Sequence, residues 1–207
     1  MFFPSGTHKD HGLAFNPLKA IVSPRPIGWI SSIGADGVHN LAPYSFFNAI
    51  SETPPMVAFS GSPGTQGDKD SVKNIEETGD FVVNIVSSDL LNAMNISSAS
   101  VPRELSEFDQ AKLTPKPSTL VTSPHVGESP CYLECRLWQI IDLPAASEGV
   151  KSRLVIGEVV GIGIDDALIT AEGKIDVTKY QPAARLGYKD YAMIKDVFEL
   201  DRPDTNT

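Results

Sequence analysis

Runs of apolar residues, separated by turn-forming residues, follow one another along this chain of 207 residues. The first run, residues 27–33, is rich in β-branched and aromatic side chains and predicts a strand. Residues 34–37 read Gly-Ala-Asp-Gly and predict a turn, so residues 38–41 should form the second arm of a β-hairpin. Because proline lacks the N–H that a sheet ladder needs, we expect the pairing not to extend past Pro43.

The same pattern predicts further strands and two short helices. Residues 70–79 predict a helix that Asp70 or Ser71 caps and that Gly79 ends. Residues 88–97 carry apolar side chains at helical spacing and predict a second helix. Further strands are expected at residues 56–60, 81–86, 132–143 and 153–164.

Three segments fall outside this pattern. We expect a loop at residues 61–69 and a turn at residues 145–151. Residues 101–123 are irregular and contain several prolines. Because a loop this long in a compact domain is usually functional, we interpret it as an arm over an active site or over a dimer partner.

The chain shows no internal repeat, low-complexity tract or linker. We therefore expect one domain over residues 1–207, with a lead-in segment at 1–22 and a flexible tail at 202–207. Strands outnumber helices. The fold class is predicted to be mainly β, an antiparallel Greek-key barrel with a few peripheral helices.

Composition limits the partners and the compartment. The net charge of −9 argues against nucleic acid or an anionic membrane as a partner. No apolar run approaches the roughly 20 residues that span a bilayer, and the N-terminus does not have the pattern of a secretory signal. Cys131 and Cys135 would lie roughly 13 Å apart on one strand, too far for a disulfide with each other. We therefore expect a reduced, cytoplasmic protein.

The residue types of a side-chain catalyst are missing. There is no G-x-S-x-G elbow, and no cluster completes a metal site around His8 and His11. His39 and His125 stand alone in sequence and are interpreted as structural. We expect no catalytic side chain and no metal, which is typical of an enzyme whose cofactor carries the chemistry.

One position has the local features of an anion site. A helix N-terminus offers free N–H groups and a partial positive charge, and Lys69 stands directly before the helix expected at residues 70–79. From the residues alone, a capped surface helix beside a solvated lysine explains this spacing better.

Seven fragments, in order, carry a resemblance to a known family. They read PRPIGWISS, NLAPYSFFN, KDSVKNIEETGDFVVN, EFD, ESPCYLEC, IGEVV and ARLGYKDYAMI. Together they cover nearly the whole chain, which resembles the flavin reductase-like family, including its NAD(P)H:FMN reductases and flavoredoxins. The resemblance implies a six-stranded FMN-binding split barrel that forms a homodimer with FMN at the subunit interface.

The resemblance also implies where FMN would bind. Lys-Asp-Ser at residues 69–71 matches the family's flavin-phosphate element, with Ser71 where threonine is commoner. Residues 40–45 would offer donors to the ring edge. Arg185 would be a second cation at the flavin, or alternatively an ordinary salt-bridge partner. Trp29 would contact the flavin, or alternatively belong to the hydrophobic core. The candidate cofactor-binding residues are Trp29, Ser31, Ser32, Asn40, Ala42, Pro43, Tyr44, Ser45, Ser60, Lys69, Asp70, Ser71 and Arg185.

The implied activity is hydride transfer from NAD(P)H to FMN, with reduced flavin or electrons passed to a partner such as a monooxygenase. The alternative is a flavoredoxin-like electron carrier without a nicotinamide site. A split-barrel oxidase that acts on a pyridoxine phosphate is a third reading. Neither NADH versus NADPH nor the electron acceptor follows from the sequence.

Overall fold

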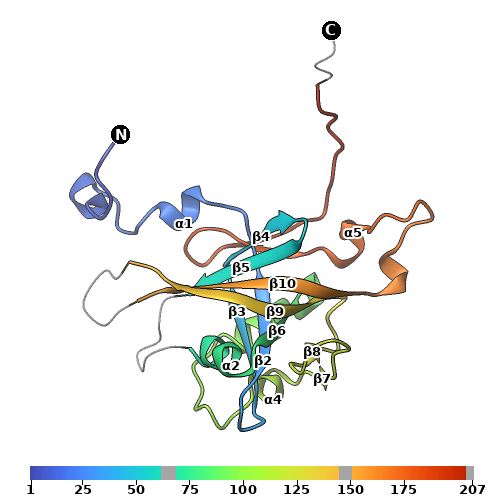
Figure 1. Cartoon of the computed structure of the whole chain (residues 1–207). Helices are drawn as coiled ribbons and strands as arrows, with labels where there is room; N and C mark the ends of the chain where they lie inside the picture. The colour runs from blue at the N-terminus through green and yellow to red at the C-terminus, as the bar shows by residue number, and fades with distance from the viewer. Residues whose placement is uncertain (62–68, 145–150, 204–207) are drawn as a thin grey trace.

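A seven-stranded antiparallel sheet forms the body of the protein in the computed structural model, which describes residues 1–61, 69–144 and 151–203 (Figure 1). The strand order is β3-β2-β6-β9-β10-β5-β4. The strands are β2 (Gly28–Ile33), β3 (His39–Tyr44), β4 (Phe46–Glu52), β5 (Pro55–Gly61), β6 (Asp80–Asn84), β9 (Cys131–Asp142) and β10 (Arg153–Ile164).

Smaller elements surround this sheet. A three-stranded sheet contains β1 (Arg25–Pro26), β11 (Ala183–Arg185) and β12 (Tyr191–Met193), and a two-stranded one contains β7 (Pro115–Lys116) and β8 (His125–Val126). The α-helices are α1 (Leu18–Ile21), α2 (Asp70–Thr78), α3 (Leu91–Ile96), α4 (Glu107–Ala111) and α5 (Val177–Tyr180). Short 3-10 turns lie at η1 (His8–His11), η2 (Ser88–Leu90) and η3 (Asp166–Leu168). No helix among the described residues is long and apolar enough to cross a membrane.

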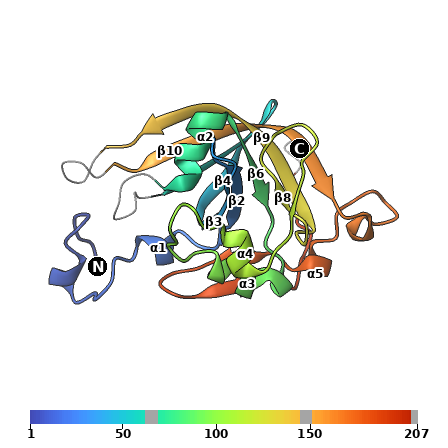
Figure 2. The same cartoon turned by 90° about the horizontal axis from the view of Figure 1, so that it is seen from below.

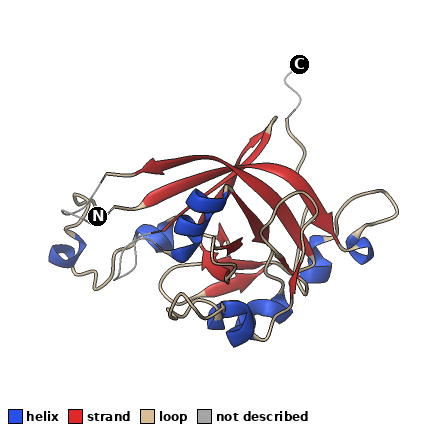
Figure 3. Ribbon diagram, turned by 60° about the horizontal axis from the view of Figure 1, so that its bottom comes forward, coloured by secondary structure: helices blue, strands red, loops and turns tan. Residues whose placement is uncertain are grey.

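The main sheet curls because its two edge strands are consecutive in the chain. Strand β3 lies at one edge and β4 at the other, yet only Ser45 separates them in the chain. Figure 3 shows the resulting curl of the sheet. The edges approach so closely that a Cβ on Gly28 would lie 2.7 Å from the Phe47 ring, and a Cβ on Gly61 would lie 2.8 Å from the Tyr44 ring. The structure therefore confirms the mainly β split-barrel class, with seven strands in the main sheet rather than six.

The curled sheet has a hydrophobic cluster on each face. Neighbouring residues of β2 belong to different clusters, because alternate side chains of a strand point to opposite faces. Ile30 packs with Phe59 and with Ile75 of helix α2, whereas Trp29 packs with Phe108 of helix α4. Helices α3 and α4 therefore cover one face of the sheet at β2, and helix α2 covers the other; all three are visible in Figure 2, with α2 apart from α3 and α4.

The expectation that strand pairing would not extend past Pro43 was wrong. Strand β3 continues through Pro43, which pairs with Trp29, to Tyr44, which pairs with Gly28. Proline is tolerated there because β3 is an edge strand: the missing N–H lies on the edge of β3 that pairs with no other strand.

Residues 101–123 are less irregular than expected, since they contain helix α4 and strand β7. They pack on the sheet of their own chain. Near its start, the segment buries Glu107 against β3. Near its end, Thr122 and Ser123 donate hydrogen bonds of 2.6–3.0 Å to Asp80 of β6. This segment is therefore fastened to the sheet at two strands, β3 and β6.

The remaining expectations are met in part. Helix α2 ends at Gly79 as predicted, but Lys69 is its N-cap position and no side chain caps it. The helix expected at residues 88–97 begins as the 3-10 turn η2. Both cysteines are free. The loop at residues 61–69 and the turn at 145–151 lie almost entirely outside the described residues, as does most of the tail.

We predict that Asp80→Asn lowers the free energy of unfolding by about 2–3 kcal/mol at pH 7, because a buried carboxylate that accepts several hydrogen bonds loses its charge. Burial alone would raise the pKa of Asp80, but hydrogen bonds from Ser123 and Thr122 hold it below its usual value. The stabilisation is thus present above about pH 4 and is lost as the pH falls through the lowered pKa.

Urea unfolding of wild type and Asp80→Asn at pH 7 and pH 3 measures this difference. A gap between the two proteins that does not narrow at pH 3 would contradict the role assigned to this carboxylate.

Candidate functional site

The start of helix α2 has the features of an anion site. Its N-cap residue Lys69 is extended, and no side chain of the residues that the structure describes caps the first-turn N–H groups. The Lys69 ammonium lies 5.0 Å from the centre of the Tyr44 ring. Burial lowers the pKa of Lys69, which is the direction expected of a cation that lacks a counter-ion. A partial positive helix end and a desolvated lysine therefore meet at one place.

A buried hydroxyl without a partner lies beside this helix start. Tyr44 is 3% exposed, and its Oη makes no hydrogen bond in the described part of the chain. Burial raises the pKa of Tyr44 above its usual value, partly countered by the neighbouring Ser71 hydroxyl. Native proteins pair nearly all buried polar groups, so an orphan hydroxyl of this kind is typical of a binding site.

A chain of buried hydrogen bonds fastens helix α2 to strand β3. The Ser71 hydroxyl donates to Asn40 Oδ1 at 2.7 Å, and Asn40 Nδ2 donates to both carboxylate oxygens of Glu107 at 3.0 and 3.1 Å. The Leu41 N–H donates to the same carboxylate at 3.0 Å. Burial raises the pKa of Glu107. Asn40 and Ser71 are thus engaged with each other and fix the position of the helix start.

Strand β2 pairs with one edge of β3, so only N–H groups on the other edge could be the ring-edge donors expected from sequence. Leu41 directs its N–H to Glu107, and Pro43 has none. Because N–H groups along an edge strand alternate between inward and outward directions, the next outward donor is at Ser45. Ser45 is half-buried at the bend, as are Ala42 and Pro43 before it. Nearby, Ser60 pairs with Phe46 across β4 and β5.

Three further predicted residues are buried and hydrogen-bonded to other parts of the chain. Trp29 is fully buried and donates from Nε1 to the Ser97 hydroxyl at 2.8 Å. Ser31 donates to the Pro124 carbonyl, and Ser32 accepts from Asn74 Nδ2 at 3.2 Å. These contacts occupy the polar atoms of all three residues with other parts of the chain.

Arg185 lies in the smaller sheet. It donates to the Tyr191 hydroxyl and to the Tyr188 carbonyl, and its guanidinium stacks over the Tyr191 ring. Within the described ranges, no hydrogen bond, ion pair or ring contact links it to the start of α2. Its strand partner Arg25 is buried and donates to the Leu186 carbonyl at 2.8 Å.

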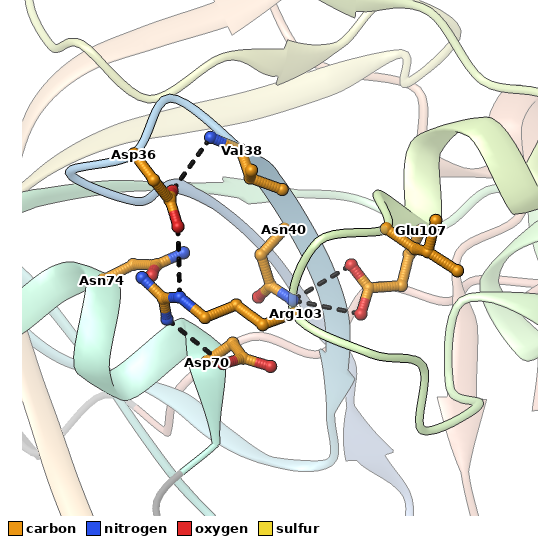
Figure 4. Close-up of a pocket in the computed structure, with 8 residues that line it drawn as sticks. Asp36, Val38, Asn40, Asp70, Asn74, Arg103 and Glu107 are labelled. Carbon is orange, nitrogen blue, oxygen red and sulfur yellow. Dashed lines mark hydrogen bonds and ion pairs between the residues drawn. The ribbon is translucent and has the colours of Figure 1, made fainter.

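Two charged residues of the site were not among the candidates from sequence. Glu107 and Arg103 both come from the segment that looked irregular, and they line a small hollow beside the helix start (Figure 4). Glu107 lies in the EFD fragment, which was a usable signal; Arg103 had none. The hollow is lined by Asp36, Val38, Asn40, Asp70, Asn74, Arg103, Leu105 and Glu107.

The described site carries a cation and polar groups that can bind a ligand. Among residues 1–61, 69–144 and 151–203, no group of three His, Cys, Asp or Glu side chains could hold a metal ion. Burial raises the pKa of the Cys131 and Cys135 thiols, which disfavours the reactive thiolate. The arrangement offers an anion site at α2, near the ring of buried Tyr44, and polar groups at the Ser45 bend that follows Tyr44 in the chain.

Comparison with known proteins places this geometry among flavin proteins. The family model described as "Flavin reductase like domain" matches residues 22–179. An uncharacterized protein of Aquifex aeolicus is 37% identical over 183 residues, which cover 88% of this chain and 90% of that one.

Two solved structures are similar along nearly their whole length. Nitrilotriacetate monooxygenase component B from Bacillus cereus is 33% identical, with a TM-score of 0.87 over 97% of this chain and 98% of that one. The 2-nitrobenzoate 2-nitroreductase of Pseudomonas fluorescens is 30% identical, with a TM-score of 0.82 over 99% of this chain and 98% of that one.

We predict that Tyr44→Phe leaves the ligand-free protein as stable as wild type or more stable by about 1 kcal/mol, because it removes a buried hydroxyl that has no hydrogen bond. Tyr191→Phe is the matched control, since its hydroxyl is bonded to Arg185. Urea unfolding of both variants tests this. If Tyr44→Phe were the more damaging of the two, the hydroxyl would have a partner in the protein.

Proposed function

Since this chain belongs to the flavin reductase-like domain family, we propose that it binds FMN and acts as an oxidoreductase that takes hydride from NADH or NADPH. One observation carries the proposal most directly: the uncapped start of helix α2, with Lys69 beside it, suits a terminal phosphate. FMN ends in such a group, whereas riboflavin does not.

The residues present fit the phosphate of FMN. Lys69 would supply a positive charge, and the first-turn N–H groups of α2 would supply donors. The orphan hydroxyl of Tyr44 lies beside them and would gain a partner. The Ser71 hydroxyl already donates to Asn40, so we assign Ser71 to holding the helix start in place.

FMN, when bound, supplies the hydride-accepting chemistry of the reaction. The chain's own part is to bind and orient. The Ser45 N–H and hydroxyl at the bend would contact the ring edge and stabilise the negative charge that develops there on reduction. Asn40, Glu107 and Arg103 would keep the phosphate end rigid. No side chain of the described site is required to take up or give a proton.

The electron acceptor is proposed from a relative. The 33% identical Bacillus cereus structure is by title one component of a nitrilotriacetate monooxygenase, which supports a role in which reduced flavin passes to a partner monooxygenase. The 30% identical relative is by title a nitroreductase, which supports direct reduction of a substrate as the second candidate. An FMN electron carrier without nicotinamide activity is the further alternative.

A homodimer is proposed from exposed apolar side chains on the two chain ends. Phe198 and Leu200 are 88% and 87% exposed on the extended C-terminal segment, and Ile21 of α1 is 75% exposed (Figure 1). A second copy of the chain would cover them. The two free cysteines support a reducing, cytoplasmic location.

Lys69→Ala should weaken FMN binding by roughly ten- to hundredfold, as expected for loss of a charge-assisted contact, and change riboflavin binding less than about twofold. FAD, whose phosphates are not terminal, should bind wild type less tightly than FMN. Lys73→Ala, one turn along the same helix and exposed, is the matched control. Calorimetric titration measures all three flavins. Riboflavin binding to wild type as tightly as FMN would reject the phosphate site.

The rate of anaerobic flavin reduction by NADH or NADPH should vary less than about threefold between pH 6 and pH 8, because no group that titrates there takes part. Burial lowers the pKa of His125, which keeps that imidazole neutral over most of this range. His39→Ala and His125→Ala should stay within a few-fold of wild type in stopped-flow traces. A reduction rate that changes steeply with pH in wild type, but not in one of these variants, would show that the substituted histidine is a general acid or base.

Light scattering should give the mass of two chains for the FMN-bound protein. A chain that ends at Lys195 lacks Phe198 and Leu200 and should dissociate at a higher protein concentration, since less apolar surface is buried between copies. A monomer at all concentrations, with FMN bound, would reject the dimer.

A further inference from the structure

Arg103 lies beside the start of helix α2, next to the carboxylates of Asp36 and Asp70 (Figure 4). It contacts Asp36 of the β2–β3 turn at 3.3 Å and Asp70 at 3.2 Å. It also contacts Glu77, in the last turn of α2, at 3.6 Å. Its side chain is 27% exposed, so these charges are only partly screened by water.

The hairpin makes room for this arginine. A Cβ on Gly34 would meet Asp36 Oδ1 first and would lie 2.9 Å from Arg103 Nη2 and 3.2 Å from Asn74 Oδ1. Any other residue at this position would therefore shift the side chains of the Asp36–Arg103 ion pair. The absence of a side chain on Gly34 and the placement of Arg103 are therefore parts of one arrangement.

The negative charge of Asp70 disfavours anion binding at the start of α2. It is the first residue of α2 and follows Lys69 directly. A carboxylate in the first turn of a helix is itself attracted to the helix N-terminus, so it competes there with any other anion. A bound phosphate would also be repelled by it. The observed contact turns Asp70 toward Arg103 instead.

We propose that Arg103 is a positioning residue for the flavin phosphate: it holds and neutralises Asp70, so that Lys69 and the helix start keep a positive potential. This inference rests on the proposed FMN site. A purely mechanical brace between the hairpin and helix α2 is the competing explanation. The two differ because a brace affects all flavins, whereas the charge of Asp70 affects the phosphate alone.

The test compares FMN with riboflavin on four proteins by calorimetry at fixed ionic strength. Arg103→Gln should weaken FMN binding on the order of tenfold, as expected for one uncompensated charge a few ångströms away at a partly exposed site, and riboflavin less than about twofold. Adding Asp70→Asn should restore FMN binding. Adding Asp36→Asn should not, because Asp36 lies in the hairpin turn.

Two controls separate charge from folding. Arg153→Gln removes another arginine held by α2, through Glu76 at 2.7 and 2.9 Å, and should leave the ratio of FMN to riboflavin affinity unchanged. Asp70→Asn alone keeps the contacts of Arg103 to Asp36 and Glu77. It should bind FMN as tightly as wild type or a few-fold more tightly, which decides the matter even if Arg103→Gln does not fold.

Several results would overturn the proposal. These are equal losses for FMN and riboflavin in Arg103→Gln, failure of Asp70→Asn to restore FMN binding, equal restoration by Asp36→Asn, and weaker FMN binding in Asp70→Asn alone. A wild-type preference for FMN that survives Arg103→Gln overturns only the role of Arg103. A wild type that binds riboflavin as tightly as FMN overturns the phosphate site as well.

Discussion

The closure of the sheet between two consecutive edge strands is the constraint on which the rest of the structure depends. One residue, Ser45, separates β3 from β4, so the opposite edges of a seven-stranded sheet must meet. Gly28 and Gly61 allow the approach because neither carries a side chain against the facing rings. The same closure buries Tyr44 and leaves Ser45 at a bend. The candidate site is thus a consequence of how the barrel closes.

Helix α2 completes the site only because buried polar groups hold its first turn. Ser71, Asn40 and Glu107 form one hydrogen-bonded chain from the helix through β3 to α4. Breaking a buried polar network of this kind costs free energy, and a fully hydrogen-bonded one fixes a single arrangement of the packed elements. Arg103 adds a second link through Asp70. The segment at residues 101–113 therefore holds the start of α2 in place through contacts to Asn40 and Asp70.

Sequence pattern alone was enough for the elements whose signals are local. The hairpin turn, helix α2 with Gly79 at its end, and the paired long strands β9 and β10 follow from periodicity and turn chemistry. Lys69 became a candidate only through the resemblance to the family, because its spacing alone favoured a solvated lysine beside a capped helix. Pro43 could not be placed correctly, because its tolerance depends on β3 being an edge strand, which only the full sheet order shows.

Long-range contacts explain what the sequence could not predict. Trp29 and Ser31 look available on a hairpin, yet Ser97 and Pro124, distant in the chain, occupy their polar atoms. Glu107 and Arg103 act across more than thirty residues of sequence on α2 and on the hairpin. Spacing within a segment carries no information about such partners. The resemblance to a family supplied the fold, but it did not separate groups that bind from groups that position.

The central claim is that this barrel is built to hold a flavin and pass electrons from a nicotinamide. The most direct measurement is the absorption spectrum of the protein reconstituted with FMN and freed of excess, followed by anaerobic addition of NADH and of NADPH. The account predicts flavin bands that remain with the protein and bleach with at least one nucleotide. Protein that retains no flavin, or flavin that dithionite reduces but neither nucleotide does, would contradict it.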